Sequence, residues 1–191
     1  MRALLVSSII LLILISLTSQ QSLGETITPI LIITWKANNY TPAFYLGKSL
    51  PTAKTKIDVA LQLLDNKKLI DLSKNDIRWY VNNKLEDSGL GLFNFSFTAP
   101  YLGEQSVLLR VVVLNYKGEE WNQFLTIPIV RPEAIIDTAD SAQLKPLPYF
   151  FNIPSDNKLK VDWGEDGKYI TLRIQNPTNL LEVAQSSVLK K

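Results

Sequence analysis

Residues 76–91 read DIRWYVNNKLEDSGLG, and this stretch decides the fold predicted for the rest of the chain. Ile77, Trp79 and Val81 are two positions apart, so in an extended strand their side chains face the same side of a sheet. The pair Asn82-Asn83 follows, and asparagine tolerates the positive φ angles that two-residue hairpin turns require. The stretch predicts a central strand with one buried face, followed by a tight reversal of the chain.

Further strands are predicted on both sides of this stretch. The segments are Ile30–Thr34, Thr55–Asp65, Leu92–Thr98, Ser106–Tyr116 and Glu120–Val130. In 92–98, Phe93, Phe95 and Phe97 alternate with polar residues, which predicts three core rings. For residues 59–68 a helix is the alternative, but the β-branched start of the segment favours a strand.

Two of these strands have predictable places in their sheet. Residues 106–116 are apolar on both faces except at Arg110, which predicts a central strand. Residues 120–130 contain Pro128, which cannot donate a ladder hydrogen bond and therefore suits an edge. About seven strands between residues 28 and 130, with no long helix, are typical of an immunoglobulin-like β-sandwich.

Arg131-Pro132 is the predicted domain boundary, so that residues 25–131 form the sandwich and 132–191 a smaller, incomplete one. The strands expected in the second part are 133–137, 149–153, 158–163, 168–175 and 181–189, the last with a short helix as the alternative. The turns expected between them are Pro146–Pro148, Gly164–Gly167 and Asn176–Asn179. A sandwich this small leaves a strand edge that something else must cover.

Residues 1–24 form a separate N-terminal segment with a composition unlike that of the rest of the chain. Arg2 is the only charge before Glu25, and 3–17 is an apolar run of signal-peptide length. Ser22 and Gly24 place small residues at −3 and −1 of a cut before Glu25. The alternative is an uncleaved anchor over residues 3–24. Both predict an exported chain (periplasmic, cell-surface or secreted) that meets the membrane only through this segment.

Composition excludes several classes of function. The formal net charge is +2 and the charges are interspersed, so no nucleic-acid partner is expected. The sequence contains no cysteine and no histidine, which removes thiolate nucleophiles, imidazole bases and most transition-metal ligands. We therefore expect no cofactor, no catalytic residue and no metal-binding residue.

Two groups of acidic residues were weighed against this expectation. Asp162, Glu165 and Asp166 could form a calcium loop, but glycine at the third position and arginine at the twelfth violate the EF-hand pattern. The other group is Asp65, Asp71, Asp76, Glu86 and Asp87, from which a hydrolase could draw two carboxylates. Both groups fall at predicted turns, which favours solvated surface charge.

Aromatic residues supply the candidate surface for a ligand or a partner. The residues chosen are Tyr40, Phe44, Tyr45, Tyr149, Phe150 and Phe151. Exposed rings beside Asn38 and Asn39 would suit stacking on a sugar, or contact with a protein. Core packing is the alternative for the 40–45 loop. For the three consecutive rings at 149–151, the alternative is packing of one face on the first domain.

The strand with W-Y-V-N-N-K at 79–84, and the apolar strand after Tyr101-Leu-Gly103, resemble bacterial immunoglobulin-like extracytoplasmic proteins. The resemblance spans about residues 28–190. This sequence differs from disulfide-bonded immunoglobulin domains because it lacks their two cysteines. It implies a non-catalytic structural or binding module of the cell envelope that engages a protein partner, or another copy of itself, through a strand edge or an aromatic surface. A carbohydrate-binding module that uses Tyr40–Tyr45 is the alternative.

Overall fold

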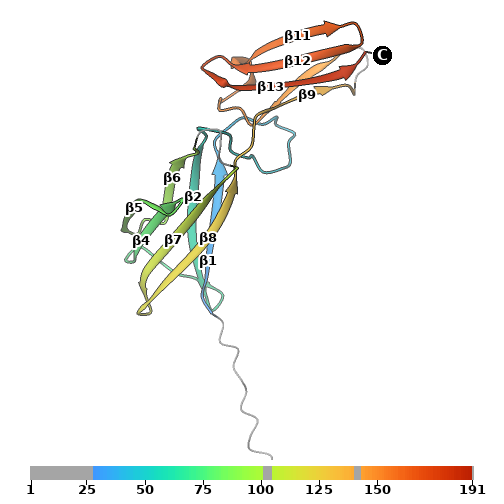
Figure 1. The fold of residues 1–191 in the computed structure, drawn as a ribbon. Helices are drawn as coiled ribbons and strands as arrows, with labels where there is room; N and C mark the ends of the chain where they lie inside the picture. Colours follow the sequence, from blue (N-terminus) through green and yellow to red (C-terminus); the bar gives the residue numbers. More distant parts are fainter. Residues whose placement is uncertain (1–27, 101–104, 140–142, 191) are drawn as a thin grey trace, which may run out of the picture.

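The computed structural model describes residues 28–100, 105–139 and 143–190, and its regular structure is almost entirely β-strand (Figure 1). The predicted signal segment or anchor at 1–24 and the Tyr101–Gly103 motif lie outside these residues. Within the described ranges, no helix has the length and apolar character needed to span a membrane. The protein is all-β with several antiparallel sheets, as predicted.

Two antiparallel sheets form the N-terminal part. In the first sheet, β2 pairs with β1 on one side and with β3 and β6 on the other; the second sheet has the order β5-β4-β7-β8. The strands are β1 (Ile30–Ala37), β2 (Lys56–Asp65), β3 (Lys68–Leu69), β4 (Asp76–Val81), β5 (Lys84–Leu90), β6 (Asn94–Thr98), β7 (Ser106–Tyr116) and β8 (Glu119–Pro128). The central place of β7 and the edge place of β8 are both as predicted.

A single apolar core lies between these two sheets, and Trp79 is at its centre. The Trp79 side chain is fully buried and stacks on Phe95, with ring centroids 5.4 Å apart. Its indole N–H donates to the carbonyl of Leu92 at 2.8 Å, so the one polar atom of the ring is paired. Asn82 and Asn83 have φ angles of 49° and 66°, which confirms the predicted hairpin turn after β4.

Two details of the first part differ from the prediction. Residues 84–90 form strand β5, which pairs along β4, whereas the sequence analysis assigned no strand to them. Their side chains are almost all exposed, so no apolar alternation marked the strand. Phe93 precedes β6 and is exposed, because regular pairing begins only at Asn94; Phe95 and Phe97 lie on the core face as expected.

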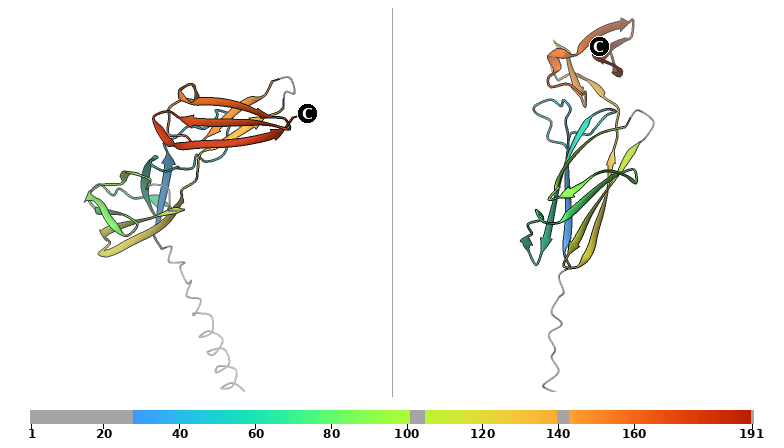
Figure 2. Two further views of the ribbon diagram at one scale, coloured as in Figure 1. Left: turned by 45° about the horizontal axis from the view of Figure 1, so that its top comes forward. Right: turned by 90° about the vertical axis from the view of Figure 1, so that its left-hand side faces the viewer.

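The C-terminal part has a two-stranded ribbon and a three-stranded sheet. The ribbon pairs β9 (Glu133–Asp137) with β10 (Lys145–Tyr149); after the short 3₁₀ turn η1 (Asp156–Lys158), the sheet has the order β11 (Lys160–Asp166), β12 (Tyr169–Asn176) and β13 (Asn179–Leu189). A second, smaller core is centred on Phe151, Leu172 and Ile174. These strands lie across one end of the first sandwich (Figure 2).

Several predictions for this part were wrong. The second strand is β10, not 149–153, and it contains Pro146 and Pro148, which were expected to break the chain. Both prolines occupy alternate positions of an edge strand, where their missing N–H groups can point away from β9. The turn after β11 is Gly167-Lys168 rather than 164–167, and residues 179–189 form a strand, which removes the helix alternative.

The two cores share no residue, although the chain does not divide cleanly between them. Tyr40, in the loop after β1, packs on the second core and forms an isolated bridge with Phe151. The N–H of Tyr40 donates to the Phe151 carbonyl, and the N–H of Phe150 donates to the Tyr40 carbonyl, both at 2.7 Å. The boundary at 131–132 stays a prediction, with the 38–55 segment reaching across it.

Candidate functional site

Strand β11 forms an open edge of the C-terminal sheet. It pairs with β12 on one side and with no other strand in the described part of the chain. It is the outermost strand, at the top of Figure 1. An edge strand presents unpaired backbone N–H and C=O groups, and these can accept a further strand.

The same strand carries two exposed apolar side chains. Val161 and Trp163 are opposite Ile174 and Leu172 in the register, so all four side chains lie on one face of the sheet. Leu172 and Ile174 are fully buried, whereas Val161 is 37% exposed and Trp163 is 43% exposed. This apolar face is therefore covered over β12 and only half covered over β11.

The candidate aromatic residues have different environments. Tyr149, Phe150 and Phe151 are buried, and the Tyr45 ring lies edge-on against Tyr149 and Phe150, at centroid distances of 5.4 and 5.9 Å. In the 40–45 loop, Phe44 is 63% exposed. Most of these rings therefore hold the 38–52 loop against the C-terminal part, and Phe44 is the one offered to solvent.

A buried polar cluster lies at the junction of the two parts. The carboxylate of Glu182, on β13, is 2% exposed and accepts hydrogen bonds from Thr52 (3.2 Å), from the backbone N–H of Asn152 (3.2 Å) and from the side chain of Asn176 (2.7 Å). The Asn152 amide also donates to the Ala53 carbonyl at 2.9 Å. The groups that donate to Glu182 are neutral, so this buried carboxylate is satisfied by hydrogen bonds alone.

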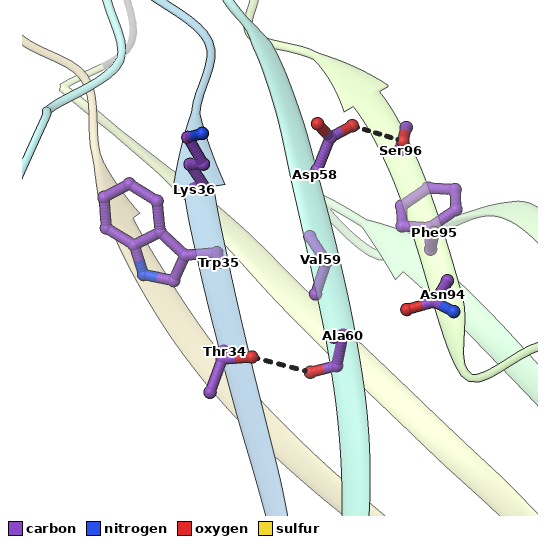
Figure 3. A pocket seen from close by; sticks show the side chains of 9 residues that line it. All are labelled: Thr34, Trp35, Lys36, Asp58, Val59, Ala60, Asn94, Phe95 and Ser96. Atoms are coloured by element: carbon purple, nitrogen blue, oxygen red, sulfur yellow. Dashed lines mark hydrogen bonds between the residues drawn. The ribbon is translucent and has the colours of Figure 1, made fainter.

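A shallow pocket of about 440 Å³ lies on the outer face of the first sheet (Figure 3). The register places six of its side chains in two rows across β1, β2 and β6. The rows are Lys36, Asp58 and Ser96, and then Thr34, Ala60 and Asn94. The small side chain of Ala60, between Thr34 and Asn94, leaves room in the second row.

Asp58 is the charged centre of this pocket. Ser96 and Asn38 each donate to its carboxylate at 2.6 Å, and Lys56 lies 3.5 Å away. The hydrogen bonds from Ser96 and then Asn38 hold the pKa of Asp58 below its ordinary value. A carboxylate that is stabilised in its charged form is a poor proton donor, so it suits hydrogen bonding rather than acid catalysis.

A second hollow, of about 570 Å³, adjoins the first and shares Lys36 with it. Its wall includes Asn38, Asn39 and Tyr40 from the loop and Asn152 from the C-terminal part. Burial, and then the neighbouring Asp156, raise the pKa of Tyr40, which keeps its phenol protonated. Both hollows combine polar groups with apolar surface, and neither places two carboxylates together.

The five acidic residues weighed as hydrolase candidates are not gathered at one site. Glu86 and Asp87 lie in strand β5 rather than in a turn, and Asp71 is bonded to its neighbour Ser73. Asp65 was expected to be solvated but is 5% exposed, bonded by Tyr116 at 2.6 Å and paired with Lys117 at 2.5 Å. Its partners belong to the β7–β8 turn, which they fasten to the end of β2.

A calcium-binding loop at residues 162–166 does not fit the structure, because these residues belong to strand β11. Asp162 lies in β11 at 3.2 Å from Lys160, and Glu165 is paired with Lys190. Among residues 28–100, 105–139 and 143–190, no group of three acidic side chains is arranged to hold a metal ion.

Comparison of the chain with protein-family models, with curated proteins and with solved structures gives no significant match. The functional inference therefore depends on the geometry and chemistry of the chain itself.

Sequence reasoning did not single out the Glu182 cluster or the exposure of Trp163. The residues of the cluster are isolated polar positions up to 130 residues apart, with no local pattern to connect them. The alternation around Trp163 predicted an apolar face on β11. Whether that face is covered depends on a strand layer that is distant in sequence.

Proposed function

We propose that the chain is a non-catalytic, exported structural or binding module of the cell envelope that engages a protein partner through the open edge of β11. In this proposal an immunoglobulin-like sandwich carries a smaller, incomplete sandwich that makes the contact. The observation that supports the proposal most strongly is that the edge of β11 is unpaired while Trp163, on the core face of the same strand, is half exposed. An added strand gains backbone hydrogen bonds and covers the apolar side chains at the same time.

Two further features support a binding role over catalysis. The junction cluster around Glu182 and the Tyr45 contacts hold the two parts together, as a spacer that presents an edge requires. Export is supported by Arg2 followed by the apolar run 3–17. Absence of cysteine and histidine from the sequence removes thiolate nucleophiles and imidazole bases.

Site-specific photocrosslinking in the producing cell tests the proposal. A photoreactive amino acid replaces Trp163 in one variant and Phe44, which is also exposed, in the other. We expect a protein adduct from position 163 and none from position 44. Adducts from position 44 alone would mean that the partner contacts the 40–45 loop instead of β11. No protein adduct from either position would contradict a protein-binding role.

A carbohydrate-binding module is the second candidate, favoured by the two adjoining hollows, which offer hydrogen-bonding groups beside apolar surface. Hydroxyl, amide and carboxylate groups line them, and Asn38 connects them by its bond to Asp58. Asn38 is exposed, so Asn38→Ala should lower the free energy of unfolding by only about 1 kcal/mol, through loss of its bond to Asp58. Loss of binding to immobilised glycans in this variant would support the candidate. A chain that binds no glycan would remove it.

A further inference from the structure

Strand β11 has a charge pattern that is complementary to itself. It runs from Lys160 to Asp166, with Trp163 at the midpoint. If a second copy of the strand lies antiparallel to it, with Trp163 facing its own counterpart, each Lys160 faces Asp166 of the second copy. Opposite charges placed directly across an antiparallel pair stabilise that pair.

In this arrangement the N–H and C=O groups of Trp163 must point towards the second copy, and the hydrogen bonds within the sheet show that they do. The N–H of Lys190 donates to the carbonyl of Lys168 at 2.9 Å, so the even-numbered residues of β12 bond towards β13. The odd-numbered residues of β12 therefore bond towards β11, and Tyr169 pairs with Asp166. On β11 this leaves the N–H and C=O groups of Val161, Trp163 and Glu165 directed at the open edge.

The outer face of β11 disfavours the register that is shifted by one residue. With Trp163 on the twofold axis, Asp162 lies opposite Gly164 of the second copy, which has no side chain and no charge. With the axis one residue earlier, each Asp162 would lie opposite its own counterpart. Like charges directly across a strand pair are destabilising, so that register is disfavoured.

The ion pair that Lys160 makes within the chain does not oppose this exchange. Its amine lies 3.2 Å from Asp162, and the two side chains are 62% and 42% exposed. Exposed pairs of this kind contribute little to stability. Lys160 can therefore turn to the second copy at small cost.

The geometry points to a second copy of this chain as the occupant of the open edge, paired antiparallel through β11 about an axis at Trp163. The pairing makes one continuous sheet of β13, β12 and β11 from each copy and places the two Trp163 rings against each other. Such a contact is isologous and closes as a dimer. The inference rests on the proposed role of the β11 edge as a protein contact.

Charge substitutions at Gly164 test the pairing and its register together. A Cβ atom added at Gly164 would have Thr171 as its nearest neighbour, at 3.9 Å, so the folded chain accepts a side chain there. We expect sedimentation of the full chain, in one fixed concentration of non-ionic detergent, to show a monomer–dimer equilibrium. Gly164→Asp should raise the midpoint concentration about tenfold, since two like-charge contacts form, and Gly164→Lys should lower it.

Single cysteines locate the axis, because the natural sequence has none. In a hydrogen-bonded antiparallel pair the two Cα atoms are about 5.5 Å apart, which a disulfide can span. Trp163→Cys should therefore give a disulfide-linked dimer under mild oxidation, and Val161→Cys should not. A faster cross-link at position 161, or Gly164 effects of opposite sign, would overturn the register.

A monomer at all concentrations, or a dimer indifferent to both charges at Gly164, would overturn self-pairing. The photocrosslink at position 163 then separates the two proposals. An adduct with the mass of another protein keeps the proposed function, whereas the absence of any protein adduct removes both.

Discussion

The hydroxyl of Thr52 donates a hydrogen bond to the carboxylate of Glu182 at 3.2 Å, which joins residues 130 positions apart at the junction of the two cores. Removal of this carboxylate takes the acceptor from the backbone N–H of Asn152 and from the side chain of Asn176, whereas the Thr52 hydroxyl can still bond to Thr55. Glu182→Ala should therefore lower the free energy of unfolding by roughly 2–4 kcal/mol. Denaturant titration followed by tryptophan fluorescence measures this loss.

The control for that change is Glu119→Ala, at an exposed position, which should alter the free energy of unfolding by less than about 0.5 kcal/mol. If the two variants are equally stable, the Glu182 cluster does not hold the junction.

The two tryptophans with similar sequence surroundings should differ sharply in their effect on stability. Trp79 is fully buried and fills the centre of the first core, so Trp79→Ala should cost roughly 3–5 kcal/mol. Trp163 is half exposed, so Trp163→Ala should cost less than about 1 kcal/mol in the monomer. Equilibrium unfolding at low protein concentration compares them. Where Trp79→Ala fails to fold, Trp79→Phe, which loses the bond to Leu92, provides a smaller measurable loss.

Replacement of Tyr45 and Phe44 distinguishes a structural loop from a ligand surface. Tyr45→Ala removes two edge-on ring contacts and should lower the free energy of unfolding by about 1–3 kcal/mol. Phe44→Ala, one residue away and exposed, should leave it nearly unchanged. Thermal unfolding of both variants checks the contrast. Equal stability of the two variants would mean that the 38–52 loop is not fastened by Tyr45.

Protonation of the Asp65 carboxylate should contribute to the loss of folding stability at acid pH. The bond from Lys117, and then that from Tyr116, hold the pKa of Asp65 below its ordinary value, so the folded state binds this proton less readily than the unfolded chain does. The stabilisation is complete above the ordinary aspartate pKa and is lost as pH falls through the lower folded value.

Unfolding measured from about pH 6 down to pH 2 should therefore show a smaller loss of stability for Asp65→Asn than for the wild type. Lys117→Met, which removes the first cause of the pKa shift, should also flatten the curve. A wild-type curve that is parallel to both variants would contradict this assignment.

Local sequence was sufficient where one face of a strand meets a core and the other meets solvent. It predicted β2, β4 and β12 nearly to their ends, because apolar side chains at every second position require a strand with one covered face. It failed for β5 and β10, whose pairing is determined by the neighbouring strand rather than by their own apolar pattern. It also failed for the buried Asp65, because the Lys117 and Tyr116 that pair with it are 51 or more positions away.

The sequence by itself determined that the described chain is built from antiparallel strands around Trp79, because the two-residue period of its apolar side chains fits no other regular structure. The tertiary structure alone decided that Trp163 is left half exposed at an open edge while Trp79 is sealed. Both residues sit in an alternating strand, and burial depends on how far the opposite layer extends. The first sandwich has a full second sheet to cover Trp79, whereas the two-stranded ribbon of β9 and β10 leaves the side chains of β11 partly uncovered.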